Sequence, residues 1–121
     1  MDATGRRRAV ALAQGVSYVV SGAWPLLHLR SFEAVTGPKV DDWLVRSVSG
    51  ILVAIGAAEI AAARRDAVTP ELALVGAGTA LTLGAISALN VARRRIRRVY
   101  LVDVALEGAL LLGWAFGARK R

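Results

Sequence analysis

Four long apolar runs, separated by short charged segments, make up most of the chain. Within each run the apolar side chains occupy every face of a helix, which is typical of helices surrounded by lipid or protein. About 20 helical residues cross a hydrocarbon layer about 30 Å thick, and each run is close to that length. The pattern predicts four membrane-spanning helices, over residues 8–29, 43–63, 70–92 and 99–118.

The segments between the runs are short and hold most of the charged residues. Residues 64–69 leave room for a tight reversal, so we expect an antiparallel hairpin between the second and third runs. Thr69 and Pro70 suit the start of the third helix as its N-cap and first residue. Three arginines precede the first run, but this run is longer than the apolar core of a signal peptide, and we expect it to be retained. The predicted fold class is all-α, an integral membrane four-helix bundle with short loops that forms a single transmembrane domain over residues 1–121.

Small residues recur at every fourth position in three of the predicted helices. This spacing places them on one face of a helix. Small faces let backbones approach closely in lipid, where there is no hydrophobic drive for helices to associate. We interpret these residues as helix-packing positions: Gly50, Ala54 and Ala58 in the second helix, Gly76, Ala80 and Gly84 in the third, and Ala109 and Gly113 in the fourth.

Composition agrees with a membrane protein, since 55% of the residues are hydrophobic and the mean hydropathy is +0.49. A net charge of +7 suggests nucleic-acid binding when the basic residues line a soluble helix. Here the basic residues lie at the ends of apolar runs, where they anchor helices and attract anionic lipid headgroups. We therefore expect the lipid bilayer as a partner and no nucleic acid. With no cysteine and one histidine, the chain offers no disulfide, and we expect neither a metal nor a cofactor.

The orientation in the membrane is left open by the basic residues, which divide eight to each side of a four-helix arrangement. One side holds Arg6, Arg7, Arg8, Arg64, Arg65, Arg119, Lys120 and Arg121, and the other holds Arg30, Lys39, Arg46, Arg93, Arg94, Arg95, Arg97 and Arg98. Because the positive-inside rule depends on an imbalance of such charges, three alternatives remain. The chain inserts both ways, or the dense cluster at 93–98 fixes its loop in the cytoplasm, or a partner protein decides.

Two carboxylates in the fourth run are the main candidates for chemistry. Glu107 lies about 12 Å along the predicted helix, close to the membrane midplane, and Asp103 is one turn earlier on the same face. An ionisable group at this depth costs at least about 2.5 kcal/mol. Both acids point away from the small-residue face, towards a second contact surface or an internal cavity. With Glu59 and Asn90, they are candidates for binding a proton or cation.

A structural role is the alternative interpretation of these acids. In it, Asp103 reaches the arginines of the third loop and Glu59 pairs with Arg64 or Arg65. Glu107 then stays protonated and bonds across the bundle.

The first loop is the second candidate site, at the membrane interface. Its candidate residues are His28, Arg30, Glu33, Lys39 and Asp42. We expect Pro25 to kink the first helix and to open a pocket towards His28. A histidine near carboxylates can act as a general base or pH sensor, but a histidine at a membrane interface can also be only an amphipathic cap. The chain contains no complete catalytic arrangement, so we predict no catalytic residue.

Segments in and around the first loop resemble a stretch of other proteins. The segments Trp24-Pro25-Leu26-Leu27-His28, Arg30-Ser31-Phe32-Glu33, Thr36-Gly37-Pro38-Lys39 and Asp42-Trp43-Leu44-Val45 resemble a stretch found in a group of small bacterial four-helix membrane proteins. The resemblance covers about a quarter of the chain. It implies a multi-pass protein of the bacterial cytoplasmic membrane, and it implies no activity, because none is known for that group.

Three classes of function fit these observations. A small transporter or channel would use Glu107 and Asp103 at its ion site. An accessory or scaffold subunit of a larger membrane complex would use the small-residue faces for docking. A membrane-interface enzyme or lipid-binding protein would use His28, Arg30 and Glu33. Because 121 residues give little room to enclose a transport path, we also expect a homo-oligomer or a membrane partner protein.

Overall fold

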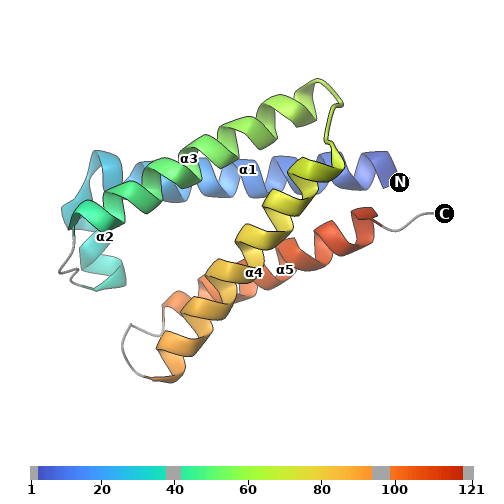
Figure 1. Ribbon diagram of the computed structural model, residues 1–121. Helices are drawn as coiled ribbons and strands as arrows, with labels where there is room; N and C mark the ends of the chain where they lie inside the picture. The colour runs from blue at the N-terminus through green and yellow to red at the C-terminus, as the bar shows by residue number, and fades with distance from the viewer. Residues whose placement is uncertain (1–2, 38–41, 94–98, 119–121) are drawn as a thin grey trace.

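The structure, a computed structural model, describes residues 3–37, 42–93 and 99–118 of the chain. These residues form helices and no strand, which confirms the all-α fold class. The helices are α1 (Ala3–Leu27), α2 (Leu29–Thr36), α3 (Asp42–Arg64), α4 (Pro70–Ala92) and α5 (Tyr100–Ala118) (Figure 1).

Within the described residues, three helices are long and apolar enough to cross a membrane: α1 from Gly5 to Leu27, α3 and α4. An integral membrane protein has such helices. The α5 helix is not among the three, so the structure does not confirm a fourth crossing.

The helix α2 was not predicted, and its presence corrects the expected end of the first span. Instead of continuing to Leu29, α1 ends at Leu27, because His28 adopts a non-helical backbone conformation (φ −152°, ψ 80°). The Nδ1 atom of His28 accepts a hydrogen bond from the backbone N–H of Ser31 (3.1 Å) and so caps α2. Gly37 ends α2 at φ 102°, a value that favours glycine. The chain thus turns at His28 and continues as a short separate helix.

The helices are arranged around α1, which contacts all four of the others. The α1 and α3 helices lie side by side, and α4 packs along α5 (Figure 1). The chain reverses direction between α3 and α4, but these two helices diverge and do not form the packed hairpin expected from the short loop (Figure 1). The bundle therefore consists of two helix pairs joined through α1.

Glycines bring α1 and α3 into very close contact. A Cβ atom added at Gly56 would lie 2.6 Å from the carbonyl oxygen of Gly15, and one added at Gly22 would lie 2.5 Å from that of Ser49. None of these glycines belongs to the predicted small-residue faces. The predicted face of Gly50, Ala54 and Ala58 is exposed instead, and a Cβ at Gly50 would meet no described residue of another helix within 4 Å.

The small residues of α4 face the interior. Gly76 lies against Gln14 and Trp114, and Ala80 is 1% exposed. A Cβ at Gly84 would lie 3.2 Å from Cβ of Glu107. In α5 the two predicted packing positions differ, since Gly113 packs against Val10 whereas Ala109 is exposed.

The packed core occupies the end of the bundle that carries the two termini. Its buried apolar members are Val10, Ala11, Tyr18, Ala63, Ala80, Leu110 and Trp114. Val10 and Ala11 come from the first half of α1 and Tyr18 lies just past its middle, Leu110 and Trp114 come from the second half of α5, and α3 and α4 contribute one residue each. The other end of the bundle is hollow, and the candidate site lies there.

Candidate functional site

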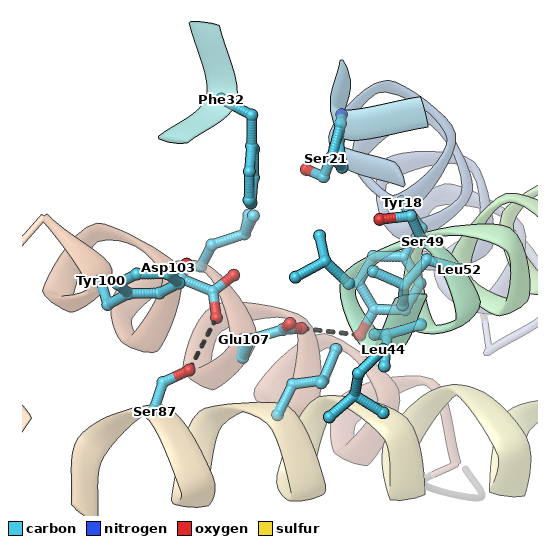
Figure 2. A pocket seen from close by; sticks show the side chains of 15 residues that line it. Tyr18, Ser21, Phe32, Leu44, Ser49, Leu52, Ser87, Tyr100, Asp103 and Glu107 are labelled. Carbon is cyan, nitrogen blue, oxygen red and sulfur yellow. Dashed lines mark hydrogen bonds between the residues drawn. The ribbon is translucent and has the colours of Figure 1, made fainter. Parts of the chain in front are cut away.

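A cavity of about 300 Å³ lies at the end of the bundle opposite the termini. All five helices contribute to its wall (Figure 2). Much of the lining is apolar, including Pro25 and Phe32. Its polar side chains are two carboxylates, Asp103 and Glu107, and five hydroxyl groups, those of Tyr18, Ser21, Ser49, Ser87 and Tyr100. No lysine, arginine or histidine lines the cavity in the described ranges.

Both carboxylates come from α5, and each is held by a hydroxyl group of a neighbouring helix. They are four residues apart and therefore lie on one face of the helix. Asp103 accepts a hydrogen bond from Oγ of Ser87 in α4 (3.3 Å), and Oε1 of Glu107 accepts one from the hydroxyl group of Tyr18 in α1 (2.7 Å) (Figure 2). Glu107 is 1% exposed. The cavity face of α5 is thus acidic, and α1 and α4 fix its geometry.

Glu107 is the final acceptor of a chain of buried hydrogen bonds. Nε1 of Trp114 donates to Oε1 of Gln14 (2.9 Å), and Nε2 of Gln14 donates to the hydroxyl oxygen of Tyr18 (3.1 Å). The same Gln14 nitrogen also donates to the carbonyl oxygen of Gly76 (2.9 Å). Each bond along the chain points its donor towards Glu107. Such an aligned series of donors supports negative charge at its acceptor end.

Sequence reasoning missed Gln14, Tyr18 and Trp114, which fix Glu107 in place. Ionisable groups stand out in an apolar run because of their charge, whereas these three side chains are polar but uncharged. One signal was present, because Gln14 and Tyr18 are four residues apart in an apolar run and so share a face. That signal places both residues on one helix face, but it does not identify the acid that they bind.

Glu59 of α3 is completely buried at 0% exposure. Neither of its carboxyl oxygens has a hydrogen-bond partner among the described residues. It lies within electrostatic range of Glu107. The alternative in which Glu59 pairs with Arg64 or Arg65 does not fit this structure, since the carboxyl group is unpartnered.

Asn90, the fourth predicted member of the ion site, stands apart. Its Nδ2 atom donates to the carbonyl oxygen of Ile86 in its own helix (2.8 Å), and it does not line the cavity. The structure thus brings Asp103 and Glu107 together on the cavity wall and buries Glu59 in the bundle, where it does not line the cavity.

The predicted loop site is not gathered into a cluster. His28 is exposed and caps α2. Arg30 is exposed, Glu33 is half-buried, and Asp42 is exposed in the first turn of α3. Lys39 lies outside the described residues. Pro25 lines the cavity, but His28 does not, so this cavity is not the pocket expected towards His28. Phe32 of α2 lines the cavity instead.

Within the described part of the chain, no three acidic or histidine side chains are grouped as a metal site would require. The cavity can therefore offer two carboxylates and several hydroxyl groups to a ligand, inside a largely apolar wall.

Comparison with known proteins gives no family for this chain. No protein-family model matches it, and no curated protein and no solved structure is significantly similar to it.

Proposed function

We propose that the chain is a small multi-pass membrane transporter in which Glu107, with Asp103, binds a proton or cation. The observation that carries the proposal is the position of Glu107, which is buried in the bundle and lines a cavity of about 300 Å³. Ionisable residues at membrane depth are rare, and they mark ion and substrate pathways. The hydrogen bond from Tyr18 fixes this carboxylate at the cavity wall.

A fourth crossing by α5 belongs to the proposal. Its 19 residues correspond to about 28 Å at 1.5 Å per residue, close to the thickness of the hydrocarbon layer. The α5 helix also packs against α1 and α4, both of which are long and apolar enough to span. The middle of α5, where Glu107 lies, is then near the midplane. We place the protein in the bacterial cytoplasmic membrane because of the resemblance of its first loop.

A transporter fits this arrangement better than an open channel. The cavity occupies one end of the bundle, and the core around Val10, Leu110 and Trp114 occupies the other end. A ligand in the cavity would therefore reach one side of the membrane at a time. Transporters bind their cargo near the midplane and expose the site alternately to the two sides.

The proposal is tested with the purified chain in liposomes that enclose a pH-reporting dye. Sodium, potassium and a panel of amines are offered outside in turn. We expect at least one of these cations to drive proton exchange well above the rate of empty liposomes, and we expect Glu107→Gln to abolish the exchange. Glu71→Gln is the matched control, because Glu71 is exposed at the start of α4. Unchanged exchange by Glu107→Gln would refute the proposal.

A role as an accessory subunit is the second candidate, and one observation favours it. The small-residue face of Gly50, Ala54 and Ala58 is exposed on α3, and large apolar side chains such as Leu74 (74% exposed) cover the outside of α4. Small exposed faces suit the docking of another helix in lipid, from a second copy or from a partner protein. Co-purification with one defined larger complex after mild solubilisation would support this role. A chain that purifies alone and exchanges protons would contradict it.

A further inference from the structure

The cavity that holds Asp103 and Glu107 has two chemically different parts. One wall carries both carboxylates, and most of the remaining surface is apolar, with rings from Phe32, Tyr18 and Tyr100 (Figure 2). In the described chain no basic side chain lines the cavity to neutralise the acids from within. A ligand that satisfies both parts must bring a positive charge to α5 and cover the apolar wall.

We infer that the ligand is an organic cation, an ammonium group carried on a compact apolar body. This inference rests on the proposed function, because it assigns a ligand class to the same cavity. The ammonium group would donate to the carboxylates of Asp103 and Glu107, which lie on one face of α5. The apolar body would occupy the space bounded by α1, α2 and α3.

A bare inorganic cation fits the cavity poorly. Its volume of about 300 Å³ is that of about ten water molecules. Sodium and potassium bind through oxygen atoms alone, and apart from its carboxylates and hydroxyl groups the cavity wall is apolar. A hydrated ion would also leave the apolar wall in contact with water. An organic cation of this size removes that apolar surface from water.

The aromatic side chains add a second attraction for a cation. A cation over the face of an aromatic ring gains about 0.5–2 kcal/mol, with the larger values in desolvated sites. Phe32 reaches the cavity from α2 (Figure 2), and its ring packs edge-on against Trp24 at 5.3 Å between ring centres. Trp24 is itself held by a hydrogen bond from Nε1 to Oγ of Ser31 (2.9 Å). The ring of Phe32 is therefore positioned before any ligand arrives.

Two sources supply this chemistry, namely a free amine and the headgroup of an aminophospholipid. A phospholipid would bring a negatively charged phosphate group beside two carboxylates, and the described lining has no lysine or arginine to neutralise it. This observation favours the free amine. The experiment therefore contains an arm for each source.

The test measures binding to the full chain by titration calorimetry in detergent micelles, with empty micelles as the blank. The probe is 2-phenylethylamine, which is cationic at neutral pH. Its neutral analogue is 2-phenylethanol, and phenylacetate is the anionic one. We expect saturable binding of the amine and at least tenfold weaker binding of both analogues. Equal binding of 2-phenylethanol would overturn the inference, because the carboxylates would then contribute nothing.

Variants locate the site. Asp103→Asn and Glu107→Gln should each weaken binding of the amine about tenfold or more, the effect of losing a charge-assisted hydrogen bond. Phe32→Leu keeps the wall apolar but removes the ring, so it should weaken the amine and leave 2-phenylethanol unchanged. This variant keeps the inference falsifiable if a carboxylate variant does not fold. Glu71→Gln is the control and should bind as the native chain does. Native affinity in Asp103→Asn and Glu107→Gln would overturn the inference.

The lipid arm uses nanodiscs in which phosphatidylethanolamine is replaced by a glycolipid at constant phosphatidylglycerol. If the amine binds more tightly after the replacement, the inference is supported, and the phosphatidylethanolamine headgroup is a ligand that competes for the same cavity. If the amine binds with equal affinity in both kinds of nanodisc, the inference is supported, and the free amine is the ligand.

Failure of this inference can be told apart from failure of the transport function. Amine binding that depends on the carboxylates, without proton exchange in liposomes, would refute transport and leave the ligand class standing. Proton exchange driven by sodium alone, together with no amine binding, would refute the ligand class and leave transport standing.

Discussion

At the scale of single residues, the two most deeply buried acids have opposite surroundings. Glu107 receives the hydroxyl group of Tyr18 at the end of a chain of donors, whereas Glu59 has no hydrogen-bond partner among the described residues. A buried polar group without a partner costs about 1–3 kcal/mol, and a satisfied one does not. The same substitution at these two positions should therefore have opposite effects on stability.

We expect Glu59→Met to stabilise the protein by about 1–3 kcal/mol, because it replaces an unpartnered buried carboxyl group with an apolar side chain of similar size. Glu107→Met should destabilise it, since the hydroxyl group of Tyr18 then loses its acceptor. Unfolding by SDS in mixed micelles, followed by circular dichroism, measures both. A loss of stability in Glu59→Met would mean that Glu59 has a stabilising partner in the folded protein.

Tyr18→Phe tests the chain of donors that ends at Glu107. It removes the donor to Glu107 and the acceptor of Gln14 but keeps the ring in the core. We expect a loss of about 1 kcal/mol in stability and slower proton exchange in liposomes. Thr82→Val is the control, because this exposed hydroxyl bonds the carbonyl oxygen of Gly78 in its own helix. If both variants behave alike, the chain of donors has no role of its own.

At the scale of elements, the α1–α3 contact depends on glycines that allow the two backbones to approach. A Cβ at Gly56 would meet the carbonyl oxygen of Gly15 at 2.6 Å and a methyl carbon of Val19 at 2.9 Å. One of these neighbours is backbone and cannot move aside without separating the helices. Gly50 lies on the same helix, but a Cβ added there would meet no described residue of another helix within 4 Å.

This difference predicts that Gly56→Ala destabilises the protein by about 1–3 kcal/mol, the usual cost of overpacking. Gly50→Ala should leave stability unchanged or raise it by up to about 1 kcal/mol, because alanine is the better helix former. The same SDS titration compares them. Equal stability of the two variants would contradict the close approach of the α1 and α3 backbones at Gly56.

At the scale of the whole molecule, the number of crossings decides where the termini lie. Four crossings put both termini on one side of the membrane, and three put them on opposite sides. We expect the same side, because α5 packs against two helices that are able to span. Reporters active in the cytoplasm or in the periplasm, fused in turn to each terminus, measure this. Termini on opposite sides would refute the fourth crossing and remove Glu107 from the midplane.

The sequence by itself determined the helical class and most of the helices, because these follow from local properties of the chain. Apolar runs between charged segments predicted a helix over residues 70–92, and α4 is Pro70–Ala92 with Thr69 as its N-cap. The predicted range 43–63 compares with Asp42–Arg64 for α3. The helix α2 was not predicted, because its eight residues mix polar and apolar side chains and so short a helix does not stand out as an apolar run.

For the candidate site, the sequence placed Asp103 and Glu107 on one face of a helix, because that depends only on their spacing. Their partners were decided by the tertiary structure. Tyr18 meets Glu107 only through the way α1 and α5 pack. Several faces of an alanine-rich and glycine-rich helix carry small residues, and the rotation of α3 against α1 selected Gly56 rather than Gly50. Spacing along one helix is fixed by its geometry, whereas contacts between helices depend on how all of them pack together.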